Sequence, residues 1–354
     1  MKSLKHLFLV SILMLLMAAC TDKSLSPIFF TLETERSLTE DRGLEDEMTI
    51  HEIVKVGTRY FAAGNTLYTR TETGNWTPVS PPVSGALCNT IEIFGGDLYA
   101  GFFTKGGTGL GVYYADDPDN ISWQQVPDVN VQDIQINFVK QAGTLFFVSR
   151  AGGSSDFSFW YSSDPLTVPF TESTSVDFPP TGSIPITDVA YDGADFWVTA
   201  GPWLYRGAVG TLAEVAGGPT NPGVKPFGGL LYTTVLYVST KGGELWSYNG
   251  VTWSSESVTD SPSFTKFVDL DPVVGINGDI FVGTEGSGYF RLIGGDQTNY
   301  ERRPDYNISA LYNGAINCLF LDTSVTPEAL FAGTMNAGLW RADYISGEWL
   351  WVQE

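Results

Sequence analysis

Short apolar runs recur along the chain at steps of about 45 residues, and each leads into a second strand-like run. The first run of each copy often ends in glycine or another small residue, and the second usually contains an aromatic residue. The seven first runs end at Gly64, Gly101, Val148, Gly201, Ser239, Gly283 and Gly333. Apolar runs of this length between turn residues are typical of buried strands, so the pattern predicts seven strand pairs.

Each pair is flanked by two further strand-like segments. One lies about twenty residues upstream, as at residues 186–191 and 316–321, and the other opens on an aromatic residue downstream. These aromatic residues are Trp76, Trp123, Phe170, Trp253, Tyr300 and Trp349; the fourth copy has only residues 212–215 there. Four strands per repeat over residues 48–354 predict an all-β, seven-bladed β-propeller with four antiparallel strands per blade. We expect the repeated aromatic residues to pack between blades, with ligand stacking as the alternative.

Composition narrows the function classes. Aromatic residues make up 14% of the 354 residues and charged residues only 17%, which argues against a disordered chain. The 40 acidic and 19 basic residues give a formal charge of -21, so we expect no nucleic-acid partner, because phosphates need Lys and Arg. Two histidines and the lack of a Gly-Lys dipeptide exclude a multi-histidine zinc site and a P-loop.

The first twenty residues have the layout of an export signal. Lys2 and Lys5 precede an uncharged apolar run at residues 7–17, which is too short to span a membrane, and Ala-Ala-Cys20 follows. This arrangement resembles a bacterial lipoprotein signal. The resemblance implies lipidation of Cys20, cleavage before it and attachment to the membrane, and Thr21 implies the outer membrane or cell surface. The alternative is an ordinary signal peptide with an incidental cysteine.

These observations predict three segments. Residues 1–19 are a signal peptide, and residues 20–47 are an acidic tether with a possible docking strand at 28–32. Residues 48–354 form the propeller. Cys88 and Cys318 lie in strand-like runs of blades two and seven, and we expect both to line the central channel. They form either a disulfide or two buried thiols, and the separation of their blades argues against the bond.

One turn between a third and a fourth strand carries a family resemblance. Residues 247–253, Ser-Tyr-Asn-Gly-Val-Thr-Trp, resemble a degenerate Asp-box, with partial copies around Asp116, Asp164 and Asp343. In such a turn a short Asp or Asn side chain caps backbone amides, and glycine supplies a positive φ. The chain is therefore similar to BNR-repeat propellers of the sialidase and YCF48-like kinds. This fold hosts both enzymes and scaffolds, so the resemblance implies the fold alone.

The arginines fit a structural role. Sialidases use three arginines, but Arg70, Arg206, Arg291 and Arg341 share one repeat position here, so we expect surface residues lying over aromatic rings. We therefore predict a non-enzymatic, lipid-anchored module of the cell envelope that binds an envelope protein or a glycan. The alternative is a glycoside hydrolase or sialidase-like enzyme acting on extracellular glycans.

A ligand at the channel mouth would meet polar residues of the first strands. These candidate binding residues are Glu52, Asn89, Asp133, Asp188, Lys266 and Asn317. The sequence predicts no cofactor. Calcium is the alternative, because the acidic runs at 116–120 and 269–271 supply hard oxygen ligands, but neither run has EF-hand spacing and solvated loops are the favoured explanation.

Overall fold

The computed structural model describes residues 42–45, 47–151, 157–173, 186–219, 227–240, 243–257, 273–274, 278–303, 311 and 314–354. Cys20, the expected docking strand at 28–32, Lys266 and the acidic run at 269–271 lie outside these residues. Within the part of the chain that is described, no helix is long and apolar enough to cross a membrane.

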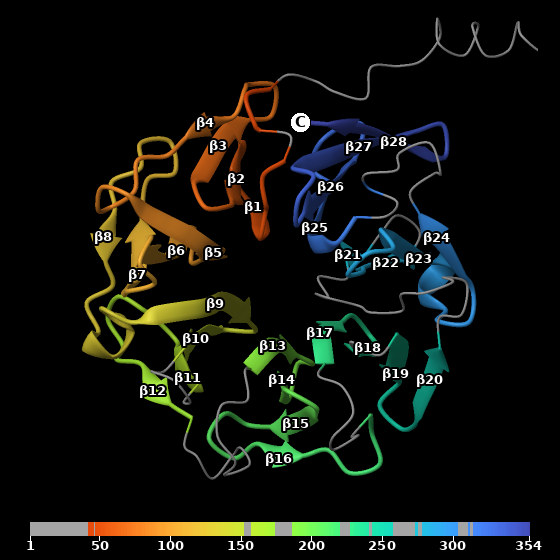
Figure 1. Ribbon diagram of the computed structural model, residues 1–354. Helices are drawn as coiled ribbons and strands as arrows, with labels where there is room; N and C mark the ends of the chain where they lie inside the picture. Colours follow the sequence, from red (N-terminus) through yellow and green to blue (C-terminus); the bar gives the residue numbers. More distant parts are fainter. Residues whose placement is uncertain are drawn as a thin grey trace, which may run out of the picture. The chain divides into compact units, whose positions relative to one another are not determined.

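Seven four-stranded antiparallel sheets stand around a central axis, as Figure 1 shows, which confirms the predicted seven-bladed β-propeller. Each sheet takes four consecutive strands of the chain, with the first innermost and the fourth outermost. We number the blades 1 to 7 in chain order. Blade 1 (orange in Figure 1) and blade 7 (dark blue) are neighbours in space although they are farthest apart in sequence.

The strand bounds follow the repeat closely. Blade 1 contains β1 (Glu52–Val56), β2 (Arg59–Ala63), β3 (Leu67–Thr71) and β4 (Thr77–Pro78). Blade 2 contains β5 (Ala86–Phe94), β6 (Asp97–Thr104), β7 (Gly109–Ala115) and β8 (Gln124–Gln125). Blade 3 contains β9 (Gln135–Ala142), β10 (Leu145–Ala151), β11 (Phe157–Ser162) and β12 (Thr171–Glu172), and the short helix η1 (Val129–Val131) precedes it. Blade 4 contains β13 (Ile186–Tyr191), β14 (Phe196–Ala200), β15 (Trp203–Gly207) and β16 (Ala213–Glu214).

The remaining blades keep the same order. Blade 5 contains β17 (Phe227–Tyr232), β18 (Leu236–Thr240), β19 (Glu244–Tyr248) and β20 (Trp253–Ser257). Blade 6 contains β21 (Val273–Val274), β22 (Ile280–Gly283), β23 (Tyr289–Leu292) and β24 (Tyr300–Arg303), with the short helix η3 (Ile293–Gly295) after β23. Blade 7 contains β25 (Ile316–Asp322), β26 (Ala329–Thr334), β27 (Leu339–Ile345) and β28 (Glu348–Gln353).

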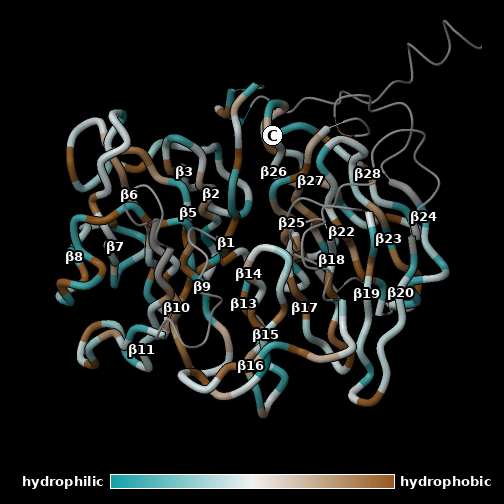
Figure 2. Tube along the Cα trace, turned by 60° about the horizontal axis from the view of Figure 1, so that its bottom comes forward, coloured by the Kyte–Doolittle hydropathy of each residue, from teal (hydrophilic) through white to brown (hydrophobic). Residues whose placement is uncertain are grey.

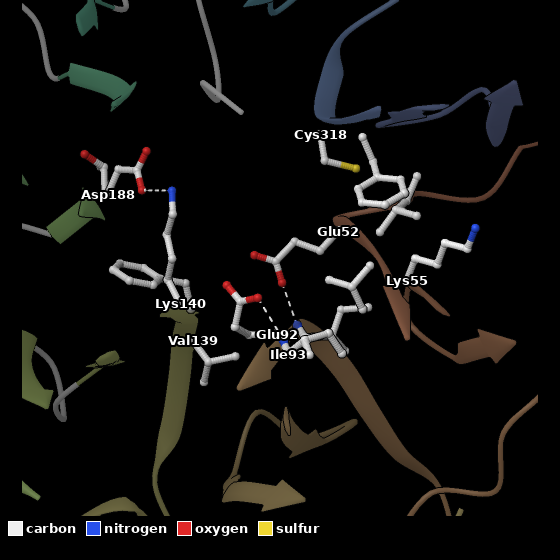
Figure 3. A pocket seen from close by; sticks show the side chains of 14 residues that line it. Glu52, Lys55, Glu92, Ile93, Val139, Lys140, Asp188 and Cys318 are labelled. Atoms are coloured by element: carbon white, nitrogen blue, oxygen red, sulfur yellow. Dashed lines mark hydrogen bonds and ion pairs between the residues drawn. The ribbon is translucent and has the colours of Figure 1, made fainter. Parts of the chain in front are cut away.

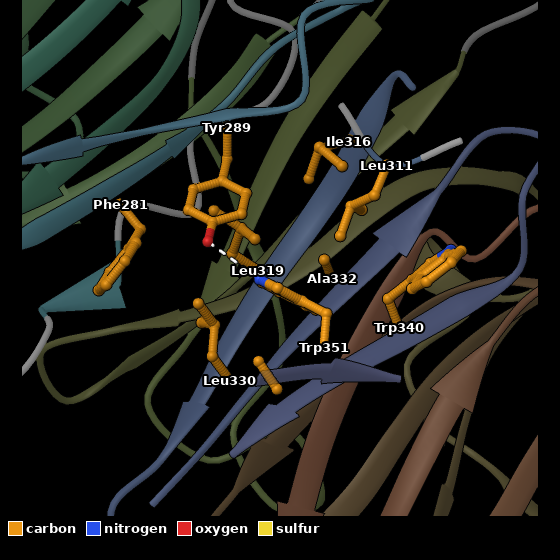
Figure 4. Packing of buried hydrophobic residues seen from close by; sticks show 10 residues of the cluster. Phe281, Tyr289, Leu311, Ile316, Leu319, Leu330, Ala332, Trp340 and Trp351 are labelled. Atoms are coloured by element: carbon orange, nitrogen blue, oxygen red, sulfur yellow. Dashed lines mark hydrogen bonds between the residues drawn. The ribbon is translucent and has the colours of Figure 1, made fainter. Parts of the chain in front are cut away.

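The buried hydrophobic side chains of the described residues form seven clusters, and each cluster joins two neighbouring blades. Figure 4 shows the cluster between blades 6 and 7, where Phe281 and Tyr289 meet Leu330 and Trp351. The Trp351 indole donates a 3.1 Å hydrogen bond to the Tyr289 hydroxyl across this junction. Figure 2 accordingly shows hydrophobic and hydrophilic positions mixed along the whole tube rather than gathered on one side. A blade alone would leave both of its faces exposed, so the ring is the unit that buries them.

The aromatic residues that open the fourth strands pack between blades as expected. Trp76 and Phe170 are buried in the clusters between blades 7 and 1 and between blades 2 and 3. Trp349 packs against the cluster of blades 6 and 7, with its ring 5.7 Å from that of Phe281. The expectation that these residues fill the spaces between blades is confirmed, and ligand stacking is not needed to explain them.

The predicted turn chemistry is present between β19 and β20. The Asn249 side-chain oxygen accepts hydrogen bonds from the amides of Val251 at 2.9 Å and Thr252 at 2.8 Å. Gly250 has φ of +93°, a conformation that other residues rarely adopt. Asp164 makes a similar turn after β11, accepting from the Leu166 amide at 3.1 Å.

Candidate functional site

The inner strands surround a central cavity of about 320 Å³. Its walls come from β1, β5, β9, β13 and β25, that is from blades 1, 2, 3, 4 and 7. The lining combines carboxylates and lysines with apolar side chains, and Figure 3 shows it from close by. The charged residues of this lining are Glu52, Lys55, Glu92, Lys140 and Asp188. A concave, partly apolar space with a few polar groups is the usual form of a ligand site.

In the part of the chain that the structure describes, the inner strands of five blades carry a β-bulge near their beginning. The pairing with the second strand skips Asn89, Asn137, Thr187, residues 228–229 and Asn317. A bulge adds a residue to one strand, so the side chains beyond it point to the opposite faces from those a regular alternation would give. The residues just after the bulge, such as Thr90, Asp188 and Cys318, therefore occupy one equivalent position.

Thr90 and Asp188 at this position, and Glu52 of the regular strand β1, form hydrogen bonds from blade to blade. Glu52 accepts from the Ile91 amide of blade 2 at 2.5 Å, and Thr90 accepts from the Val139 amide of blade 3 at 3.0 Å. Asp188 accepts from the Leu230 amide of blade 5 at 2.7 Å. The first strand is the inner edge of each sheet, so these oxygens satisfy amides that have no ladder partner on that side. The polar inner-strand residues are thus part of the scaffold that joins the blades.

Two of the predicted binding residues, Glu52 and Asp188, line the cavity. Asn89 and Asn317 are instead turned into the junctions between blades. The Asn89 amide donates to the Ile136 carbonyl at 2.6 Å, and the Asn317 amide donates to the Ile50 carbonyl at 3.0 Å. Both were predicted at the channel because they are polar residues of first strands, but both are bulge residues.

Asp133 does not belong to an inner strand. It is exposed, precedes β9 and has φ of +51°. Sequence reasoning missed Glu92 and Lys140, which lie on β5 and β9 and line the cavity. The Glu92 carboxylate accepts from the Ile93 amide at 2.8 Å and from the Gln141 amide of blade 3 at 3.0 Å. In the sequence, both appear only as a charged residue within an apolar first-strand run. Such a charge can be assigned to the cavity only when the bulge is taken into account.

Asp188 and Lys140 form an ion pair in the cavity, with the ammonium 2.5 Å from the carboxylate. Burial raises the pKa of Asp188 above its ordinary value, and the neighbouring Lys140 opposes this shift. Lys55 points away from this pair in Figure 3, and its ammonium meets Asp322 of blade 7 at 2.7 Å and Glu72 at 2.8 Å. Its charge therefore serves the junction between blades 7 and 1.

The cysteines are both buried thiols, one of the two predicted alternatives. Cys318 lines the cavity as expected, whereas Cys88 packs in the cluster between blades 1 and 2, because it precedes its bulge and Cys318 follows its own. Burial raises the pKa of the Cys88 thiol.

The acidic run at 116–120 forms a turn in which Asp117 accepts from the Asp119 amide at 2.9 Å, and Arg59 contacts Asp119. Over the residues that the structure describes, no three His, Cys, Asp or Glu side chains gather as a metal site would require.

No protein-family model and no curated protein sequence matches the chain. Solved structures resemble it in fold. YCF48 bound to a D1 peptide has a TM-score of 0.59 and 12% identity, covering 87% of this chain and 95% of that one. YCF48 from Cyanidioschyzon merolae has a TM-score of 0.57 and 12% identity, covering 85% and 96%. An ancestral GH74 enzyme has a TM-score of 0.65 and 13% identity, and covers 88% of this chain, which spans 47% of the enzyme. At these identities the likeness concerns the fold alone.

Proposed function

We propose that this protein is a lipid-anchored β-propeller of the cell envelope that binds a protein partner across the propeller and catalyses no reaction. The observation that carries this proposal is the use of the cavity's polar groups. Glu52 and Asp188 accept backbone amides of neighbouring blades, at 2.5 Å and 2.7 Å, and so form part of a rigid scaffold. A preformed cavity on rigid strands suits recognition, since little conformational entropy is lost on binding.

Two further observations favour binding over sialidase-like hydrolysis. The described residues that line the cavity include no arginine, whereas sialidase-type sites hold a substrate carboxylate with three of them. The four repeated arginines lie on third strands, where Arg70 and Arg206 stack over aromatic rings. A solved structure of the same fold, YCF48, holds a peptide, which makes a protein segment the first partner to test.

Binding and hydrolysis can be separated with one preparation. The chain from residue 21 onward is immobilised and exposed to solubilised envelope under crosslinking, and captured partners are identified by mass spectrometry. A parallel column carries Lys140→Glu, which places a second negative charge beside Asp188, and Glu348→Gln serves as an exposed control. We expect a protein captured by wild type and control and reduced on the Lys140→Glu column. Hydrolysis of a glycoside panel at ordinary enzymatic rates would refute the proposal.

The proposed anchor is tested separately. Metabolic labelling with an alkyne fatty acid should label the wild-type chain and leave Cys20→Ser unlabelled, while Cys318→Ala keeps the label. Thr21→Asp should move the labelled protein toward the inner membrane, because lipoproteins in some bacteria are sorted by that residue. Labelling that survives Cys20→Ser would refute lipidation at this position without touching the binding proposal.

A further inference from the structure

One junction of the ring differs from the other six in connectivity. Between every other pair of neighbouring blades, the chain runs directly from the fourth strand of one blade to the first strand of the next. Blades 7 and 1 have no such connection. Each blade also takes its four strands from one continuous stretch, so no strand is exchanged to close the ring. The junction of blades 7 and 1 is therefore held by noncovalent contacts.

A segment preceding β1 lies across this junction. We call residues 42–45 and 47–50 the strap. The Arg42 carbonyl accepts from the Trp76 amide of blade 1 at 2.7 Å, and the Met48 carbonyl accepts from the Gly338 amide of blade 7 at 3.0 Å. The Ile50 amide donates to the Thr334 carbonyl of blade 7 at 2.9 Å. The strap is thus hydrogen-bonded to both blades.

The strap repeats the contacts that the chain makes where the covalent connection from blade 6 enters β25 of blade 7. Between blades 6 and 7, the Gly314 carbonyl accepts from the Gly288 amide at 3.1 Å, and the Ile316 amide donates to the Thr284 carbonyl at 2.8 Å. The strap makes the same two bonds with Met48 in place of Gly314 and Ile50 in place of Ile316.

The side chains match as well. Ile50 and Ile316 are both fully buried, and Figure 4 shows Ile316 within the cluster of blades 6 and 7. Each isoleucine packs on a glycine of the neighbouring blade. A Cβ on Gly333 would lie 2.7 Å from Cγ2 of Ile50, and a Cβ on Gly283 would lie 2.9 Å from Cγ2 of Ile316. Leu44 adds a further buried apolar side chain to the cluster of blades 7 and 1.

We propose that the strap is the latch of the ring: it takes the place of the missing linker, and its release opens the junction of blades 7 and 1 while the six linked junctions stay closed. A linker is covalently joined to both of its blades, so losing its contacts leaves the blades connected. The strap is covalently joined only to blade 1, so the loss of its contacts to blade 7 frees that junction. A pull on the chain preceding residue 42 acts directly on this element, because the strap follows it in the sequence. The inference is independent of the proposed binding function and of lipidation at Cys20.

The equivalence of Ile50 and Ile316 supplies a matched experiment. Ile50→Ala and Ile316→Ala remove the same atoms from equally buried positions, and hydrogen exchange is then followed by mass spectrometry. We expect Ile50→Ala to accelerate exchange about tenfold in β26 and β27 and in β1, with blade 4 unchanged. Ile316→Ala should accelerate exchange in β22 and β25 by less than half as much. Equal effects at the two junctions, or faster exchange in all blades with Ile50→Ala, would overturn the latch.

A reversible staple gives a second test that does not depend on the stability of the alanine variant alone. The Thr49 hydroxyl donates a hydrogen bond to the Met335 carbonyl, so the two residues adjoin across the junction. Thr49→Cys with Met335→Cys, added to Ile50→Ala and verified by mass as oxidised, should restore slow exchange in β26 and β27. Reduction should abolish the rescue. Identical exchange in the oxidised and reduced forms would contradict the proposal.

Discussion

The Arg70 guanidinium lies 3.0 Å from the Glu354 carboxylate, and this ion pair joins β3 of blade 1 to the residue after β28 of blade 7. Both side chains are fully buried. The guanidinium also lies over the rings of Tyr60, Trp76 and Phe331, at 5.0, 5.1 and 5.7 Å from their centroids. Burial lowers the pKa of Arg70 to about 10, and Glu354 opposes the shift. The junction that lacks a covalent linker therefore has a buried charge pair beside its strap.

Removing one partner of this pair should be strongly destabilising. Arg70→Met leaves the Glu354 carboxylate buried. Its remaining described donors are the Trp76 indole, 2.9 Å away, and the more distant Arg42. We expect a loss of about 3–5 kcal/mol in the free energy of unfolding, measured by urea denaturation. Arg206→Met is the control, because Arg206 has the same repeat position but is more than a third exposed, and it should cost at most about 1 kcal/mol. Similar losses for both variants would show that burial of the pair is unimportant.

Acid should weaken the same junction through Asp322. Burial alone would raise the pKa of this carboxyl, but hydrogen bonds from Lys55, Ser324 and Tyr60 together hold it below its ordinary value. A carboxyl whose pKa is lower in the folded state stabilises the protein above its unfolded pKa of about 3.9 and loses that contribution as the pH falls through the folded value. We expect Asp322→Asn to lower the melting temperature at pH 7 and to lose this difference below about pH 4.

The contribution of Asp188 to stability should depend on pH in the opposite direction. Its pKa is raised, so its contribution is greatest below the unfolded pKa and is lost as the pH rises through the folded value. The gap in melting temperature between wild type and Asp188→Asn should therefore not close on acidification in the way that it closes for Asp322→Asn. Parallel pH profiles for the two variants would contradict the assignment of the shifts.

The repeat was predictable from sequence because it depends on local residue patterns. Strand pairs ending near Gly101 or Gly283 and an aromatic residue such as Trp76 recur wherever a blade needs them, so periodicity alone determined the number of blades and strands. Side-chain direction at the channel was not predictable in the same way. One additional residue, Asn89 or Asn317, reverses the alternation of an inner strand, and nothing in a single apolar run marks it.

The arginines illustrate a second limit of sequence reasoning. Their shared position predicted one surface role over aromatic rings. Arg206 fits, since it is partly exposed and lies 4.7 Å from the centroid of Trp197, but the surface role is wrong for Arg70. The difference arises because Glu354 and the strap meet only at the junction of blades 7 and 1. That environment forms only when the ring closes, so the sequence of a single repeat does not reveal it.

Close packing between blades makes one glycine sensitive to a single methyl group. A Cβ on Gly101 would lie 2.8 Å from Cγ2 of Thr90 and 3.1 Å from Cβ of Ile136 in blade 3. We expect Gly101→Ala to destabilise the protein by about 1–3 kcal/mol, since both neighbours are buried parts of inner strands. Gly286→Ala, where no atom lies within 4 Å of the added carbon, should be neutral or slightly stabilising. Thermal unfolding of both variants decides the point, and a neutral Gly101→Ala would mean that the blades can separate slightly at no cost.

Thr90 tests whether the polar inner-strand residues are scaffold. Its hydroxyl accepts from the Val139 amide at 3.0 Å and donates to Glu52 at 2.7 Å, so it connects blades 1, 2 and 3. Thr90→Val keeps the shape and leaves a buried amide without its acceptor, which should cost about 1–3 kcal/mol. The amide of Val139 should exchange faster than its neighbours on β9. Thr77→Val, which removes an exposed hydroxyl, should cost less than about 0.5 kcal/mol. If the Val139 amide stays protected in Thr90→Val, the bonds between blades do not depend on the hydroxyl and the inner-strand polar groups are free to serve a ligand.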